Sequence, residues 1–173
     1  DDEGYTTTFD SVPQRIISLA PSNTQILFAV GAGDRVVGLT EYDQYPYDFS
    51  AWIEAGNMTS IGGFSTPNQE TIASLHPDLL LATTIHDTYL STFRDLGYKV
   101  LTLNPANVSS VLNDIAMVGK AVGSEQSATT LINSINDKID MISQKIAEAH
   151  VVKPMVYYEI WYPPLMSAGS TSF

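Results

Sequence analysis

Short apolar runs rich in branched side chains alternate along the chain with segments in which apolar residues recur every three or four positions. The runs are typical of buried strands, and the periodic segments are typical of helices that cover a sheet. Glycine, proline, serine and asparagine separate the two kinds of segment. We predict strands at residues 15–20, 35–40, 78–83 and 99–103.

Helix starts are indicated by residues that cap free backbone N–H groups. Ser22 precedes Gln25 by three positions, Thr66 precedes Pro67, and Asp87 opens a further periodic segment. We predict helices at residues 22–30, 66–76, 87–96 and 108–122, and a short one near Trp52. The alternation predicts an α/β fold in three layers: a doubly wound, mostly parallel sheet with helices on both faces.

A longer helix is predicted from Ser124 to Ala149, because its apolar positions form one stripe. About 25 residues span roughly 37 Å, which is longer than most sheets are tall. A strand at 155–161 and a turn follow, with no helix after them. We therefore predict an N-terminal ligand-binding lobe (1–123), a connecting backbone helix (124–150) and the start of a truncated second lobe (151–173).

The amino-acid composition argues against several classes of function. The net charge of −11 over 173 residues argues against nucleic acid as a partner, since phosphate backbones need clustered lysine and arginine. The absence of cysteine excludes disulfides, thiolate metal sites and cysteine nucleophiles. No apolar run is long enough to span a membrane. The sequence starts at Asp1, and we expect any targeting segment to have been removed or to lie outside it.

No catalytic, cofactor or metal motif emerges. The glycines at 31, 33 and 38 close a helix and precede a strand, whereas a dinucleotide fingerprint follows a strand and opens a helix. No phosphate loop or GxSxG elbow is present. The three histidines lack the spacing of a zinc site. His86 lies just past the third predicted strand, where it either lines a ligand crevice or belongs to a surface loop.

Aromatic residues gather where predicted strands end. Tyr42, Tyr45 and Tyr47 follow the second strand, Phe64 follows two glycines, and Trp161 ends the last strand. Ligands of open α/β sheets collect at the carboxyl ends of the strands, and flat rings suit a broad planar ligand. The alternative is that some of these rings pack into small clusters under the long loops.

Several linked segments form one ordered pattern along nearly the whole chain from about Pro13: residues 13–24, 30–38, 42–46, 61–70, 75–80, 163–164 and 167–169. This pattern resembles substrate-binding proteins of ABC importers for cobalamin, haem and ferric siderophores. It implies two lobes joined by a long helix, with a ligand gripped between them. It also implies capture without catalysis and without a resident cofactor.

The resemblance also implies roles for individual residues. Tyr42 and Phe64 stand where cobalamin-binding members present aromatic rings, whereas Thr83 stands where some carry a tryptophan. The other expected ligand contacts are Asn23, Thr84, His86 and Trp161. Glu70 matches a surface glutamate that docks on arginines of the membrane permease.

These implied roles place the protein outside the cytoplasm, anchored to the membrane at full length, with a metal chelate and the permease as partners. An exposed apolar stripe on the long helix predicts self-association of this chain. Two other functions stay open: a doubly wound enzyme domain acting on a nucleotide or sugar, and a surface interaction module without a small ligand.

Overall fold

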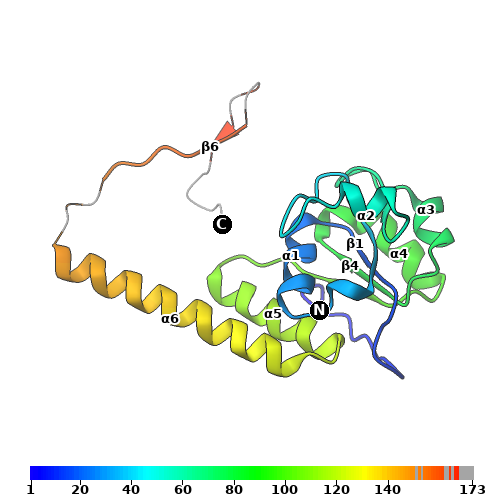
Figure 1. Cartoon of the computed structure of the whole chain (residues 1–173), viewed down its shortest axis with the longest axis horizontal. Helices are drawn as coiled ribbons and strands as arrows, with labels where there is room; N and C mark the ends of the chain where they lie inside the picture. Colours follow the sequence, from blue (N-terminus) through cyan, green and yellow to red (C-terminus); the bar gives the residue numbers. More distant parts are fainter. Residues whose placement is uncertain (151, 153, 162–163, 165, 168–173) are drawn as a thin grey trace.

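The computed structural model describes residues 1–150, 152, 154–161, 164 and 166–167. Helices surround a central sheet, and one long helix leads away from it (Figure 1). The sheet has five parallel strands in the order β3-β2-β1-β4-β5. Their bounds are β1 Ile16–Ser18, β2 Val36–Leu39, β3 Thr59–Ser60, β4 Leu79–Ala82 and β5 Val100–Thr102.

The four strands predicted from apolar runs are confirmed, and the two-residue β3 was missed. Thr59 and Ser60 are polar and half-buried, so no apolar run marks this edge strand. The chain runs outward from β1 to β3 and then crosses back to place β4 on the other side of β1. The strand order therefore reverses between β1 and β4, and their carboxyl ends form the switch point where such sheets hold ligands.

Alternate strand residues face two separate hydrophobic cores. On one face, Ile16, Leu79 and Leu81 pack with helices α1 Pro21–Ala29 and α5 Val108–Ala121. On the other face, Ile17 and Leu80 pack with α3 Gln69–Ser74 and α4 Asp87–Asp95. A buried parallel sheet needs cover on both sides, so the predicted three-layer architecture is confirmed.

Two predicted helix starts are wrong. Helix α1 begins at Pro21, one residue before the expected cap Ser22, and proline suits a first helical position because it has no N–H to leave unbonded. Helix α3 begins at Gln69, capped by Asn68, whose Oδ1 accepts from the Thr71 N–H at 3.0 Å. Pro67 and Asn68 stay outside the helix because Pro67 bridges Gly62 and the Asn68 N–H donates to the Ile61 carbonyl at 2.7 Å.

Short elements complete the lobe. The expected helix near Trp52 is α2, Ser50–Glu54. Two 3-10 turns lie at η1 Gly33–Arg35, before β2, and η2 Thr84–His86, between β4 and α4. Gly62, with φ +90°, turns the chain after β3 in a conformation that a side chain would strain. This turn lets the following loop return over the carboxyl edge of the sheet.

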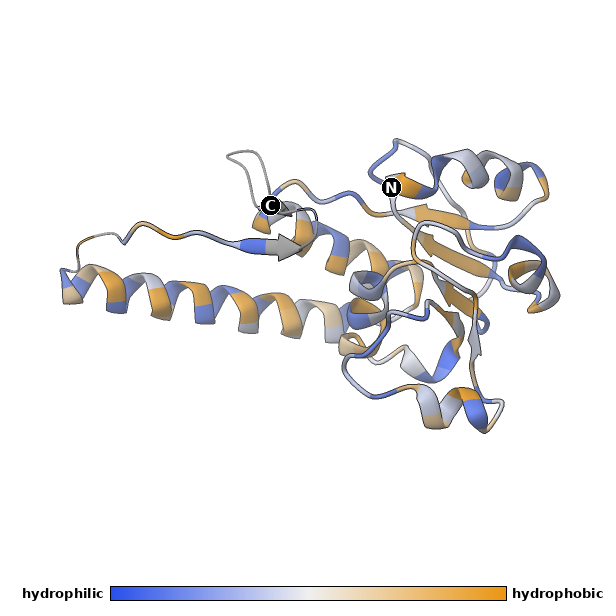
Figure 2. Ribbon diagram, turned by 90° about the horizontal axis from the view of Figure 1, so that it is seen from above, coloured by the Kyte–Doolittle hydropathy of each residue, from blue (hydrophilic) through white to orange (hydrophobic). Residues whose placement is uncertain are grey.

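The long helix α6 spans Glu125–Ala149, as predicted, and packs against the lobe along its first half. Gly119 of α5 permits this approach, since an added Cβ there would lie 2.4 Å from the Ala128 Cβ. Farther along, Ile139, Ile142 and Ile146 are exposed, and apolar positions recur along the helix (Figure 2). Strands β6 Glu159–Trp161 and β7 Met166–Ser167 pair antiparallel beyond it.

Candidate functional site

The carboxyl ends of β1 and β4 are tied together by a buried amide. Asn23, in the first turn of α1, donates from Nδ2 to the Ala82 carbonyl at 3.1 Å. Beside it, the Thr24 hydroxyl donates to Ser18 Oγ at 2.7 Å. The amide thus joins the two loops that diverge at the switch point. The Asn23 side chain is buried, and its amide is engaged in the fold.

A cavity of about 340 Å³, the switch-point cavity, opens beside this amide. Helices α1, α5 and α6 and the segment after β5 form its walls, which are mostly apolar. The residues at the strand ends that line it are Asn23, Tyr45, Thr83, Leu103 and Pro105. Its size and lining are those of a small-molecule pocket with few polar groups.

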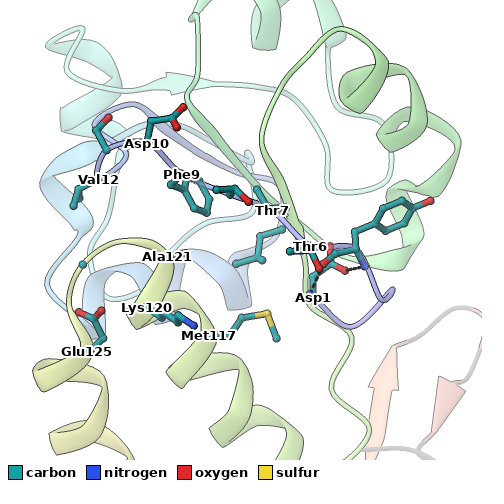
Figure 3. Close-up of a pocket in the computed structure, with 15 residues that line it drawn as sticks. Asp1, Thr6, Thr7, Phe9, Asp10, Val12, Met117, Lys120, Ala121 and Glu125 are labelled. Atoms are coloured by element: carbon teal, nitrogen blue, oxygen red, sulfur yellow. Dashed lines mark hydrogen bonds between the residues drawn. The ribbon is translucent and has the colours of Figure 1, made fainter.

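A second cavity, of about 630 Å³, lies under the N-terminal segment against the second half of α5. Met117, Lys120 and Ala121 come from the helix, and residues 5–12 form the opposite wall (Figure 3). None of the residues predicted to bind ligand lines this cavity. We therefore place the candidate site at the switch point and not in this groove.

Two tyrosines of the loop after β2 offer their rings to solvent. Tyr42 is 59% exposed and Tyr45 is 65% exposed. Tyr47 differs, because it stacks on Trp52 with ring centroids 5.8 Å apart and an interplanar angle of 18°. Tyr47 is 52% exposed, but one face of its ring is covered by this stacking, which is the alternative considered for these rings. Tyr42 and Tyr45 remain available for a ligand.

Sequence reasoning named Tyr45 as one of the three tyrosines but did not place it among the expected ligand contacts. The structure puts it on the wall of the cavity, beside the strand ends. Only contacts in the folded chain distinguish Tyr45 from Tyr47, because Tyr47 lies against the aromatic cluster of Phe28, Phe49 and Trp52. No sequence pattern carries that information.

Phe64 and His86 come together although they follow different strands. Their ring centroids are 5.4 Å apart and nearly perpendicular, with Phe64 half-buried. His86 has no exposed surface, and its two ring nitrogens contact backbone groups of Phe64 and Thr83. Burial lowers the pKa of its imidazole. The expected contact of His86 with a ligand is thus revised: its side chain supports the site from beneath.

The remaining predicted residues occupy varied positions. Thr84 opens η2 half-buried, and its hydroxyl donates to Asn104 Oδ1 at 3.4 Å. Glu70 is exposed in the first turn of α3, where a carboxylate suits the positive end of the helix dipole. Trp161 ends β6, and its side chain lies outside the described residues.

Asp114 is a charged residue that sequence reasoning missed. It lines the switch-point cavity from α5, yet it is only 1% exposed, and no hydrogen-bond donor reaches its carboxylate. Burial, and secondarily the neighbouring Asp2 carboxylate, raise the pKa of Asp114 to about 7. An acid among apolar positions of α5 was the signal in the sequence, but helical periodicity alone does not decide whether such a residue is buried.

Neither a metal cluster nor a membrane span is found where the chain is described. Over these residues no three histidine, aspartate or glutamate side chains come close enough to hold an ion together. Among the described helices, none combines the length and the apolar character needed to cross a bilayer.

Similarity to known proteins extends over most of the chain. An ABC transporter substrate-binding lipoprotein of Bacillus subtilis, itself uncharacterized, is 37% identical over 146 residues, which are 80% of this chain and 43% of that protein. A cobalamin-binding protein of Halobacterium salinarum is 28% identical over 88% of this chain and 41% of its own length. The chain thus spans about two fifths of these curated relatives.

The fold is also found among solved structures. A protein of Staphylococcus epidermidis, described as a possible iron-binding, periplasmic solute-binding protein, superimposes with a TM-score of 0.77 at 27% identity. The alignment covers 94% of this chain and 63% of that one. The periplasmic binding protein family matches residues 16–173, from the first strand onward. The chain therefore belongs to the periplasmic binding protein family.

Proposed function

We propose that the protein captures a metal-chelate nutrient outside the cytoplasm and delivers it to the permease of an ABC importer. The nutrient is cobalamin, a ferric siderophore or haem. The observation that carries this proposal is the pair of exposed rings in the loop after β2, Tyr42 and Tyr45, of which Tyr45 lines an apolar cavity at the switch point of the sheet. Flat rings with free faces bind a broad planar molecule with little loss of conformational entropy.

In this proposal the carboxyl edge of the sheet forms half of a clamp. Tyr42, Tyr45 and Phe64 contact the apolar face of the ligand, and Thr84 and Asn23 contribute polar groups at its rim. Trp161 is proposed as a further ligand contact. Residues 1–123 form this lobe, residues 124–150 the backbone helix, and residues 151–173 the start of a second lobe that completes the clamp.

Glu70 is proposed as the docking residue for the permease. Its carboxylate is exposed on the first turn of α3, so an arginine on the membrane subunit can reach it. The net charge of −11 favours approach to a basic surface. The similarity to a lipoprotein supports a location outside the cytoplasm with a membrane anchor at full length.

The alternative of an enzyme acting on a nucleotide or sugar is not favoured. The relatives described above are named for substrate binding or ligand binding, not for a reaction. The lining of the switch-point cavity is mostly apolar, and its only charged side chain is the buried Asp114. A mostly apolar lining suits non-covalent capture of a ligand.

The proposal is tested by titrating the 15N-labelled chain with cyanocobalamin, haemin and ferrioxamine B, with ATP and glucose as controls. We expect a chelate to shift the amide signals of Tyr42, Tyr45 and Phe64, with a Kd of about 10 µM to 1 mM because only half the clamp is present. Replacing both exposed tyrosines by alanine should weaken binding about tenfold, whereas Tyr5→Ala, in the N-terminal segment, should not. Binding of ATP alone, or no shift with any chelate, would contradict the proposal.

A further inference from the structure

The switch-point cavity contains a carboxylate that the fold leaves without a donor. Asp114 lines the cavity from α5 and is 1% exposed, and neither of its carboxylate oxygens accepts a hydrogen bond from the described residues. A buried polar group without a partner costs free energy, so native folds contain few of them. A ligand group that donates to Asp114 would remove this cost.

The charged neighbour of Asp114 does not supply the missing donor. Asp2 also carries a carboxylate, and one of its oxygens already accepts from the Asn104 N–H. Burial, and secondarily the Asp2 carboxylate, raise the pKa of Asp114 to about 7, and below that pH Asp114 can donate its own proton to Asp2. Once that proton is lost, two carboxylates lie close together, and a cationic donor in the cavity would offset their repulsion.

The rest of the lining decides which chemical groups can enter the cavity. Ile26, Leu103, Ile115 and Leu131 contribute apolar walls. Among the described residues that line the cavity, none is lysine, arginine or histidine, so an anionic group would meet a carboxylate and no counter-charge. An aliphatic chain suits the apolar walls. An ammonium group at its end suits Asp114, because it combines a positive charge with three N–H donors.

The size of the cavity fits an arm of a ligand and not a whole metal chelate. Its volume of about 340 Å³ is near the lower end for small-molecule pockets, whereas haem and the corrin ring are broad, rigid plates. Tyr45 lines the cavity and is 65% exposed, so its ring connects the cavity with the solvent-exposed loop after β2. A chelate core held by the exposed tyrosines can therefore extend a side arm into the cavity.

We propose that the switch-point cavity is a binding site for an aliphatic ammonium group, in which Asp114 forms the ion pair and which takes the amine-bearing arm of the chelate. The inference rests on the proposed function, because it takes the exposed tyrosines to hold the chelate core. It narrows the ligand class to ferric siderophores with a free alkylamine. The side arms of haem end in carboxylates, and those of cobalamin end in neutral amides, so neither supplies the cation.

Ferrioxamine B and its N-acetyl derivative are the matched probes, because both hold iron in the same way and only the first has a charged alkylammonium arm. At about pH 8, where Asp114 is ionised, we expect ferrioxamine B to bind the wild-type chain about tenfold more tightly than the acetylated form. Titration of the 15N-labelled chain gives both Kd values.

Asp114→Asn keeps the shape of the side chain and removes its charge, so this variant should bind the two chelates equally. Asp140→Asn, on the exposed face of α6, makes the same change in net charge and should keep the tenfold preference. Circular dichroism verifies that each variant is folded. Equal binding of the two chelates by the wild-type chain, or a preference that persists in Asp114→Asn, overturns the inference while the proposed function stands.

Hexylamine tests the cavity without a chelate. At about 1–10 mM and about pH 8 it should shift the amide signals of Leu103 and Ile115 in the wild-type chain but not in Asp114→Asn, and hexanol and hexanoate should bind about tenfold more weakly. If hexylamine binds in this way but no chelate does, the proposed function fails and the ammonium site stands. If no hexylamine shift depends on Asp114, the ammonium site fails whatever chelate the chain binds.

Discussion

Asp114 is a buried residue whose ionisation destabilises the folded lobe. Its carboxylate is buried on α5, beside the carboxylate of Asp2, and its pKa is raised to about 7. The unfolded chain releases that proton near pH 4, so the native state binds it more tightly. The contribution of Asp114 to the free energy of unfolding is therefore fully present below about pH 4 and is lost as the pH rises through about 7.

Asp114→Asn is expected to relieve this cost, because the amide has nearly the same shape and no charge. The gain in the free energy of unfolding should be about 1–3 kcal/mol larger at about pH 8 than at about pH 4.5. Urea unfolding at the two pH values measures it. Asp140→Asn, on the exposed face of α6, is the matched control and should show no such difference. Equal effects of Asp114→Asn at both pH values would refute the assignment.

His86 and Asp114 also mark the limit of prediction from sequence at the residue scale. The sequence placed His86 correctly, just past a strand end, but its burial depends on the loop that returns from β3 and seats Phe64 above it. Asp114 is buried because the segment before β1 and the helices α1 and α6 close around α5. Both outcomes arise from contacts between distant segments, which no local pattern encodes.

At the scale of elements, apolar runs were sufficient to predict β1, β2, β4 and β5, since buried parallel strands are apolar on both faces, but not the polar edge strand β3. Helix starts were less predictable, and α3 shows the reason. Thr66 and Asn68 both have side chains able to cap a helix, and the choice between them is made by the bridge of Pro67 to Gly62 and by the Asn68 N–H bond to Ile61. These contacts keep residues 67 and 68 out of the helix.

Asn68→Ala should lower the free energy of unfolding by about 1 kcal/mol, because the Thr71 N–H loses the side-chain acceptor that caps α3. Thr66→Ala is the matched control, and its effect should stay below about 0.5 kcal/mol. Urea unfolding of the two variants at one pH gives the comparison. A larger loss for Thr66→Ala than for Asn68→Ala would restore the helix start expected from the sequence.

At the scale of the whole molecule, the first half of α6 packs against the lobe and the second half is exposed to solvent. Leu131, Ile132 and Ile135 lie partly buried against the core of the lobe, whereas Ile142, 52% exposed, continues the same stripe away from it. A second lobe covers this stripe in the proposed full-length protein. In this chain the stripe is available to another copy, since apolar faces of this kind associate when they are left open.

Replacing Ile142 and Ile146 by glutamine should therefore abolish concentration-dependent association of the chain without loss of its fold. The two isoleucines pack against nothing in the lobe core, so the melting temperature should change little, whereas the surface that pairs two copies loses its apolar contacts. Sedimentation velocity over about a hundredfold range of concentration measures the association. Asn136→Gln, on another face of α6, is the matched control and should associate like the wild type. A wild-type chain that stays monomeric throughout would mean that exposed isoleucines on an isolated helix face are too few to hold two copies together.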